Sequence, residues 1–290
     1  MKILPVSALI LVFGTVLPAQ WLKDKTRGIP RTPDGKPNLT APAPRTPDGK
    51  PDLTGIWEFP VDAAIGNITM RNIGGLKPEE IQPWARALVQ QRGENLSSKD
   101  NPRFQCLPEG PGYVTDGGMR RIVQTPAMIL MLNEDLTFRQ IFTDGRALES
   151  DPNPAWMGYS VGHWDGDTLV VESNGYNART WILDGYPHTE HLRITERYRR
   201  TDLGHLEVSV AFADPSIYAR PLTVAITGRF VADTELLESV CNETEDNGQQ
   251  HWIGKLSDTK KTSVHLPAET LAKSVGVYKG QYIGGLAPSK

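Results

Sequence analysis

The segment from Gly158 to Ser173, GYSVGHWDGDTLVVES, constrains the fold most, because an Asp-Gly pair stands between two runs of strand-forming residues. Such a pair supplies the positive φ angles of a two-residue type I′ turn, whose twist matches the twist of paired strands. If Asp165-Gly166 forms that turn, His163 faces Thr168 in a β-hairpin. One face of the hairpin then carries Tyr159, Val161, His163, Thr168, Val170 and Glu172.

Alternating apolar and polar residues continue over much of the chain beyond Arg121. After a first strand over residues 53–59, this pattern predicts strands over residues 127–132, 136–143, 192–200, 205–212, 221–231 and 235–241. Short turns join most of them. We therefore predict an all-β fold with a minor helical part, an antiparallel meander that closes into a β-barrel. A two-sheet β-sandwich is the alternative, because side chains alternate in the same way in both.

One helix is predicted over residues 77–92, packed against the sheet. Pro78 suits a first helical turn, and apolar residues recur at helical spacing from Ile81 to Leu88. Pro83 lies inside this pattern, where proline limits or kinks a helix.

The most clearly alternating pair of strands flanks Asp202-Leu203-Gly204, which suits a three-residue loop with Gly204 in the left-handed conformation. Counting back from this loop places Glu196 opposite Val210, Ile194 opposite Phe212 and Tyr198 opposite Val208. The face that carries Glu196 is otherwise apolar.

The N-terminus predicts export. Residues 1–19 contain Lys2, an apolar run and Ala19, as in a secretory signal peptide. Residues 20–52 form a Pro/Gly-rich linker in which RTPDGKPNLT recurs as RTPDGKPDLT, and residues 53–290 are predicted as one barrel-like domain with a helical insertion at 77–93. In the periplasm or outside the cell, Cys106 and Cys241 are expected to form a disulfide.

Charge and composition limit the partners. The net charge is −3, with both signs interspersed, which does not favour a polyanion such as nucleic acid. The densest basic cluster, from Arg193 to Arg200, alternates along one strand, where a solvated outer face is expected. No segment beyond the signal region is long and apolar enough to span a membrane.

Two resemblances follow from short blocks. Gly55-Ile56-Trp57 resembles the Gly-x-Trp signature of lipocalins and related calycin barrels, whose tryptophan plugs one barrel end. The blocks TPDGKPDLTGIW, GYSVGHWDGDTLVVES and LRITERYRR resemble those of a large set of uncharacterised secreted bacterial proteins. The resemblance implies export and a β-rich body, and it implies no reaction.

Glu196 is the first candidate for acid-base catalysis, because a buried carboxylate without a partner has a raised pKa. The alternative is a structural pair with an arginine or a tyrosine across the barrel. His188 and His191 form the most metal-like string, but an extended backbone separates positions three apart, so no metal site is predicted. His188 is instead a candidate acid or base at the barrel mouth.

The Asp165-Gly166 hairpin offers a conditional site. If its face points inward, Tyr159, His163 and Glu172 form a polar trio that orients a ligand or moves a proton. If it points outward, Leu169 and Val171 face the core, and the sequence leaves this choice open. Further ligand-binding candidates are Arg146 at a strand end, Trp181 in an aromatic pocket and Tyr198 beside Glu196.

Three functions are compatible with these patterns. The first is a secreted barrel that encloses a small, partly apolar molecule. The second is a cofactor-free lyase, isomerase or hydrolase on the same scaffold, with Glu196 and either His163 or His188 as proton carriers. The third is a non-catalytic envelope protein. The chain has no Gly-rich phosphate loop or nucleophile elbow, and no cofactor is expected.

Overall fold

A computed structural model describes residues 25–59, 76–94, 101–102, 105–114, 117–182 and 185–241. The predicted signal peptide, residues 1–19, lies outside them.

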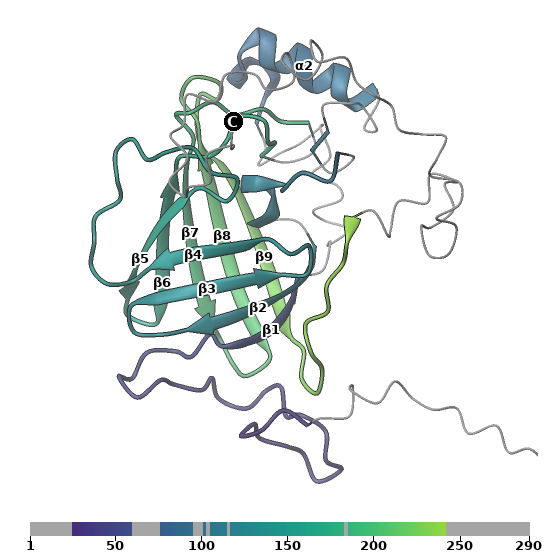
Figure 1. Ribbon diagram of the computed structural model, residues 1–290, viewed down its shortest axis with the longest axis vertical. Helices are drawn as coiled ribbons and strands as arrows, with labels where there is room; N and C mark the ends of the chain where they lie inside the picture. Colours follow the sequence, from purple (N-terminus) through teal and green to yellow (C-terminus); the bar gives the residue numbers. More distant parts are fainter. Residues whose placement is uncertain are drawn as a thin grey trace, which may run out of the picture.

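The strands form one closed barrel in chain order (Figure 1), as predicted for the fold class, which excludes the β-sandwich. They are β1 (Gly55–Phe59), β2 (Gly118–Gln124), β3 (Met128–Asn133), β4 (Phe138–Phe142), β5 (Tyr159–Asp165), β6 (Thr168–Asn174), β7 (Arg193–Arg200), β8 (His205–Ala213) and β9 (Leu222–Phe230).

The barrel is mixed, whereas the sequence predicted an antiparallel meander. β4 and β5 pair in parallel, and every other neighbouring pair, including β9 with β1, is antiparallel. The difference arises because the connection between β4 and β5, residues 143–158, is too long for a hairpin turn and carries the chain back to the other end of the sheet.

The β5–β6 hairpin forms, with a loop one residue later than predicted. Asp165 pairs with Thr168 and His163 with Val170, so Gly166 and Asp167 are the two loop residues. Gly166 has a φ of 59°, and Asp167 has no positive φ, which is the pattern of a type II′ turn. Because the opposing pairs shift by two positions, the same side chains still share a face.

The β7–β8 hairpin has the predicted register, with Ile194 opposite Phe212, Glu196 opposite Val210 and Tyr198 opposite Val208. The prediction of a left-handed Gly204 is wrong. A Cβ at this glycine would lie 2.7 Å from the Cβ of Leu39, so close packing against the N-terminal tail requires glycine there.

The predicted helix over 77–92 is divided in two. A short 3₁₀ helix, η3 (Pro78–Glu80), ends at Ile81, which bridges to Tyr218, and α2 (Pro83–Glu94) begins at Pro83. Proline is favoured in the first turn of a helix, so Pro83 starts the helix and does not kink it. A second 3₁₀ helix, η5, spans Gly110–Val114.

The predicted strand over residues 235–241 is absent, because this segment leaves the barrel without strand pairing. It ends at Cys241, which forms the predicted disulfide with Cys106. No helix in the described residues is both long and apolar enough to cross a membrane.

The N-terminal repeat forms two copies of one turn. Backbone hydrogen bonds close each copy, from Thr32 to Lys36 in the first and from Thr46 to Lys50 in the second. Gly35 and Gly49 occupy the same position in the two copies, each with a φ of 82°. The repeat is therefore a pair of equivalent, locally closed turns.

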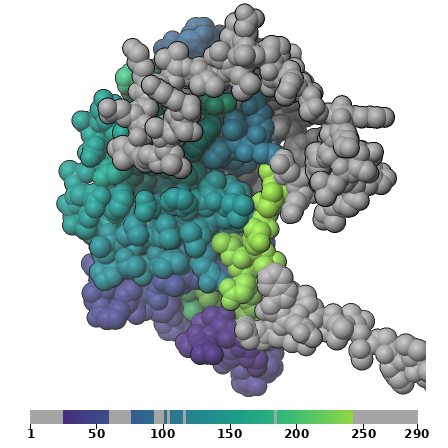
Figure 2. Space-filling model, viewed as in Figure 1, coloured from purple at the N-terminus to yellow at the C-terminus, as the bar shows by residue number. Residues whose placement is uncertain are grey.

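An equivalent arginine anchors each copy to the barrel. Arg31 makes two hydrogen bonds to the carboxylate of Asp233, just after β9, and Arg45 makes two to Asp167 in the β5–β6 loop. The backbone of Gly204 also donates to Leu39 O. The tail thus lies across the end of the barrel where these loops turn (Figure 2).

Candidate functional site

An ion pair lies inside the barrel, between β4 and β7. Arg139 donates to both carboxylate oxygens of Glu196, at 2.9 and 2.5 Å, and also to the hydroxyls of Ser160 and Ser173. The side chains of Arg139 and Glu196 are 4% and 0% exposed. The carboxylate therefore has the structural arginine partner that the sequence left as the alternative to catalysis.

Tyr198 completes the partners of Glu196, since its hydroxyl donates to Oε1 at 2.9 Å. Burial is the largest single effect and would lower the pKa of Arg139, but the charge and hydrogen bonding of Glu196, together with Tyr176 and Tyr198, raise it overall. Burial, followed by the negative charge of Glu196, raises the pKa of Tyr198. The group thus holds a charged arginine and carboxylate beside a neutral phenol.

The barrel end beneath the tail is closed. Trp57 is fully buried, its indole N–H donates to Leu53 O, and its ring packs edge-on against Phe230. The Arg200 guanidinium lies 4.8 Å from the Trp57 ring and donates to the carbonyls of Asp52 and Leu203. Burial lowers the pKa of Arg200 to about 10. This residue was predicted to lie on a solvated face, and it lies inside because it follows Glu196 and Tyr198 in the alternation of β7.

The opposite end of the barrel carries a buried histidine. His188 Nδ1 lies 3.1 Å from Thr189 O and therefore carries a proton, because a carbonyl only accepts. Nε2 lies 2.8 Å from the Thr180 hydroxyl oxygen, which also donates to Asn177 O at 2.8 Å. Burial lowers the pKa of His188, which favours the neutral form.

Tyr176 links the histidine to the interior ion pair. Its ring centroid lies 6.4 Å from that of His188 in an edge-on arrangement, and Arg139 and Glu196 both act on its pKa. Burial is the largest effect and raises the pKa of Tyr176, so the phenol remains a hydrogen-bond donor. Tyr176 therefore lies near both His188 and the interior ion pair.

The buried polar atoms that have no hydrogen-bond partner among the described residues include two donors at this end. They are the hydroxyl of Tyr176 and the indole Nε1 of Trp181, whose side chains are 3% and 7% exposed. The Arg92 guanidinium covers the Trp181 ring at 4.4 Å. Buried polar atoms are almost always satisfied, so each of these two donors would gain a hydrogen bond from an acceptor on another molecule.

The hairpin residues lie elsewhere. Tyr159, His163 and Glu172 are on the outer face of the barrel, because the opposite face of β5 and β6 carries Leu169 and Val171, which are fully buried. The polar trio therefore does not line the interior. Arg146 is exposed as well and pairs with Asp144.

The sequence analysis missed Arg139 and Tyr176. A strand was predicted over residues 136–143 without an inward face; Leu136 and Phe138 are 65% and 57% exposed, and Arg139 lies inside. The available signal was Glu196 itself, because a carboxylate on an apolar face requires a buried cation or donor.

The site contains no recognisable metal centre. No group of three or more His, Cys, Asp or Glu side chains suited to a metal ion occurs in the described part of the chain. Comparison with known proteins found no matching family model, curated protein or solved structure.

Proposed function

We propose that this protein is an exported β-barrel that binds a small, partly apolar molecule at the barrel end opposite Trp57. The binding groups are the hydroxyl of Tyr176 and the indole N–H of Trp181, with the neutral His188 beside them. The observation that carries the proposal is that both donors are buried and make no hydrogen bond of good geometry among the described residues, although Ser173 lies close enough to the Tyr176 hydroxyl to lower its pKa. Leaving such a group unsatisfied costs about 1–3 kcal/mol, which a ligand acceptor would recover.

The chemistry of these groups indicates the kind of ligand. Two aromatic side chains provide apolar contact, and each presents one donor, so the ligand needs acceptor oxygens or nitrogens on an otherwise apolar body. The charge of Arg139, in the interior near Tyr176, is balanced by Glu196. A ligand at Tyr176 and Trp181 therefore needs no charge. A ketone, ester or phenol-like compound has these properties.

Two further observations support export. The disulfide between Cys106 and Cys241 is typical of an oxidising compartment, and residues 1–19 resemble a secretory signal. Either the periplasm or the extracellular medium is compatible with both.

The proposal is tested by native mass spectrometry of the exported protein, followed by a screen of neutral aromatic ketones and esters by ligand-detected NMR. Tyr176→Phe removes one donor and keeps the ring, and Tyr159→Phe on the outer face is the matched control. We expect a bound molecule or screen hit whose affinity falls about five- to tenfold in Tyr176→Phe, as for the loss of one hydrogen bond, and is unchanged in Tyr159→Phe. Equal binding by both variants, or no ligand at all, would overturn it.

A further inference from the structure

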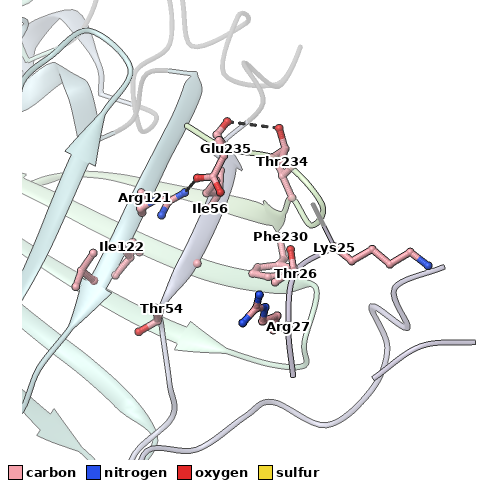
Figure 3. A pocket seen from close by; sticks show the side chains of 13 residues that line it. Lys25, Thr26, Arg27, Thr54, Ile56, Arg121, Ile122, Phe230, Thr234 and Glu235 are labelled. Carbon is pink, nitrogen blue, oxygen red and sulfur yellow. Dashed lines mark hydrogen bonds and ion pairs between the residues drawn. The ribbon is translucent and has the colours of Figure 1, made fainter. Parts of the chain in front are cut away.

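A separate cavity lies on the barrel wall where the N-terminal tail meets β1, β2 and the end of β9 (Figure 3). Its volume is about 690 Å³, within the range of about 300–1,000 Å³ that is common for small-molecule sites. Its lining includes Arg27, Thr54, Ile56, Arg121, Val231 and Glu235.

The lining has two chemical parts. Strand residues supply an apolar side that includes Ile56, Val123 and Val231, while the tail and the strand ends supply hydroxyl and charged groups. Such an arrangement of apolar contact beside a few polar groups is characteristic of sites for amphiphilic molecules.

The charge of the cavity is positive. Lys25, Arg27 and Arg121 line it together with one carboxylate, Glu235, which forms an ion pair with Arg121. Figure 3 shows Lys25 extending away from the strands. Because Arg121 is paired with Glu235, Arg27 is the basic group that remains available beside the apolar residues.

Arg27 is available to a ligand. In the described part of the chain it takes part in no hydrogen bond or ion pair, unlike Arg31 four residues later, which is held by Asp233. A guanidinium presents a planar set of donors that suits a carboxylate in two-point contact.

The tail keeps Arg27 at the cavity. The backbone N–H of Thr26 donates to Asp233 Oδ1 and its hydroxyl accepts from the backbone N–H of Asp233, both at 2.8 Å. These bonds fix the residue next to Arg27, so the guanidinium is presented from an ordered backbone.

We propose that this cavity binds a small amphiphilic carboxylate, with the carboxylate at Arg27 and the apolar chain against Ile56 and Val231. The site is independent of the one at the opposite barrel end, since the two share no residue. A chain of about ten carbons is a suitable probe because it is flexible and partly apolar.

The test compares three probes of equal chain length with different head groups: decanoate and decyltrimethylammonium below their micellar concentrations, and decanol below its solubility limit. Isothermal titration calorimetry of the full exported chain measures binding. We expect decanoate to bind at least tenfold more tightly than the other two, because only it pairs with the guanidinium.

Three variants locate the binding. Arg27→Gln removes the charge, Thr54→Trp fills the cavity from an exposed position, and Arg193→Gln on the outer face of β7 is the control. We expect the first two to weaken decanoate binding at least tenfold and the control to leave it unchanged, with circular dichroism showing that all three fold. Binding that survives either of the first two substitutions, equal binding of all three probes, or no binding of decanoate overturns the proposal.

Discussion

Arg139 and Glu196 form a two-point ion pair across the interior of the barrel, with Nη1 to Oε1 at 2.9 Å and Nη2 to Oε2 at 2.5 Å. They come from β4 and β7, which are not neighbours in the barrel. Because both groups are removed from water, each depends on the other for its charge to be tolerated. The pair therefore links two distant strands through the interior.

Removing one member of this pair should destabilise the fold strongly. Arg139→Met leaves the charge of Glu196 buried without a counterion, and we expect a loss of about 3–5 kcal/mol in the free energy of unfolding. Urea denaturation monitored by circular dichroism measures this loss.

Two comparisons test the explanation. The double variant Arg139→Met/Glu196→Leu should recover most of the loss, because no buried charge remains. Arg197→Gln breaks an exposed ion pair with Asp165 and should cost less than about 1 kcal/mol. A cost for Arg139→Met as small as that of Arg197→Gln would contradict a buried, coupled pair.

His188 should make the stability depend on pH. Burial lowers its pKa below the ordinary value of 6.5, so on acidification the unfolded chain binds a proton before the folded chain does. The contribution of the neutral ring is therefore present above pH 6.5 and is lost as the pH falls through the folded pKa.

The measurement compares urea midpoints of the wild type and His188→Gln between pH 5 and 8. The wild type should lose more stability than the variant on the acid side of this range. Parallel pH profiles, or an NMR titration that places the pKa of His188 above 6.5, would show that burial does not control this group.

The two arginine anchors of the tail should act independently. The hydrogen bond from Arg31 lowers the pKa of Asp233, and that from Arg45 lowers the pKa of Asp167, so both carboxylates stay ionised at neutral pH. Asp233→Asn should speed hydrogen exchange in residues 31–38 only, and Asp167→Asn in residues 45–52 only.

Docking of the tail should depend on pH. Because the folded pKa of each aspartate is depressed, its contribution to docking is complete above the unfolded value of about 3.9 and is lost as the pH falls through the folded pKa. If either substitution loosened both copies equally, the tail would dock as a single unit and not through two separate anchors.

The sequence predicted the barrel and its β7–β8 register because apolar residues alternate there without interruption from Leu206 to Phe212. It assigned no inward face to the strand over residues 136–143, where Leu136 and Phe138 are exposed and Arg139 occupies the interior of the barrel. Charge at an interior position cannot be inferred locally, because its burial is offset by Glu196 on a strand far along the chain.

The candidate site could be predicted only in part. Glu196, Tyr198, His188 and Trp181 were named from the sequence, and the structure gathers them in the interior or at one barrel end. Tyr176 joins them only through the turn after β6, and residue spacing does not show where such a turn directs its side chain. The Asp165-Gly166 hairpin showed its shared face but not its orientation, because polar and apolar residues occur on both faces.

The disulfide should contribute substantially to stability. Cys106 and Cys241 are separated by 135 residues, and closing a loop of that length restricts the unfolded chain by about 5 kcal/mol in the chain-entropy description. The double variant Cys106→Ser/Cys241→Ser should show a corresponding fall in urea midpoint, and adding reductant should then have no further effect. An unchanged midpoint would mean that the described bond does not hold the fold.

Binding at the Tyr176 end is the central claim, and native mass spectrometry of the exported protein, with Tyr176→Phe and Tyr159→Phe in parallel, tests it most directly. The account predicts a small neutral molecule carried by the wild type and by Tyr159→Phe, with markedly reduced occupancy in Tyr176→Phe. A wild-type protein that carries no molecule and gains none from the ketone and ester screen, or one whose occupancy is the same in both variants, would contradict it.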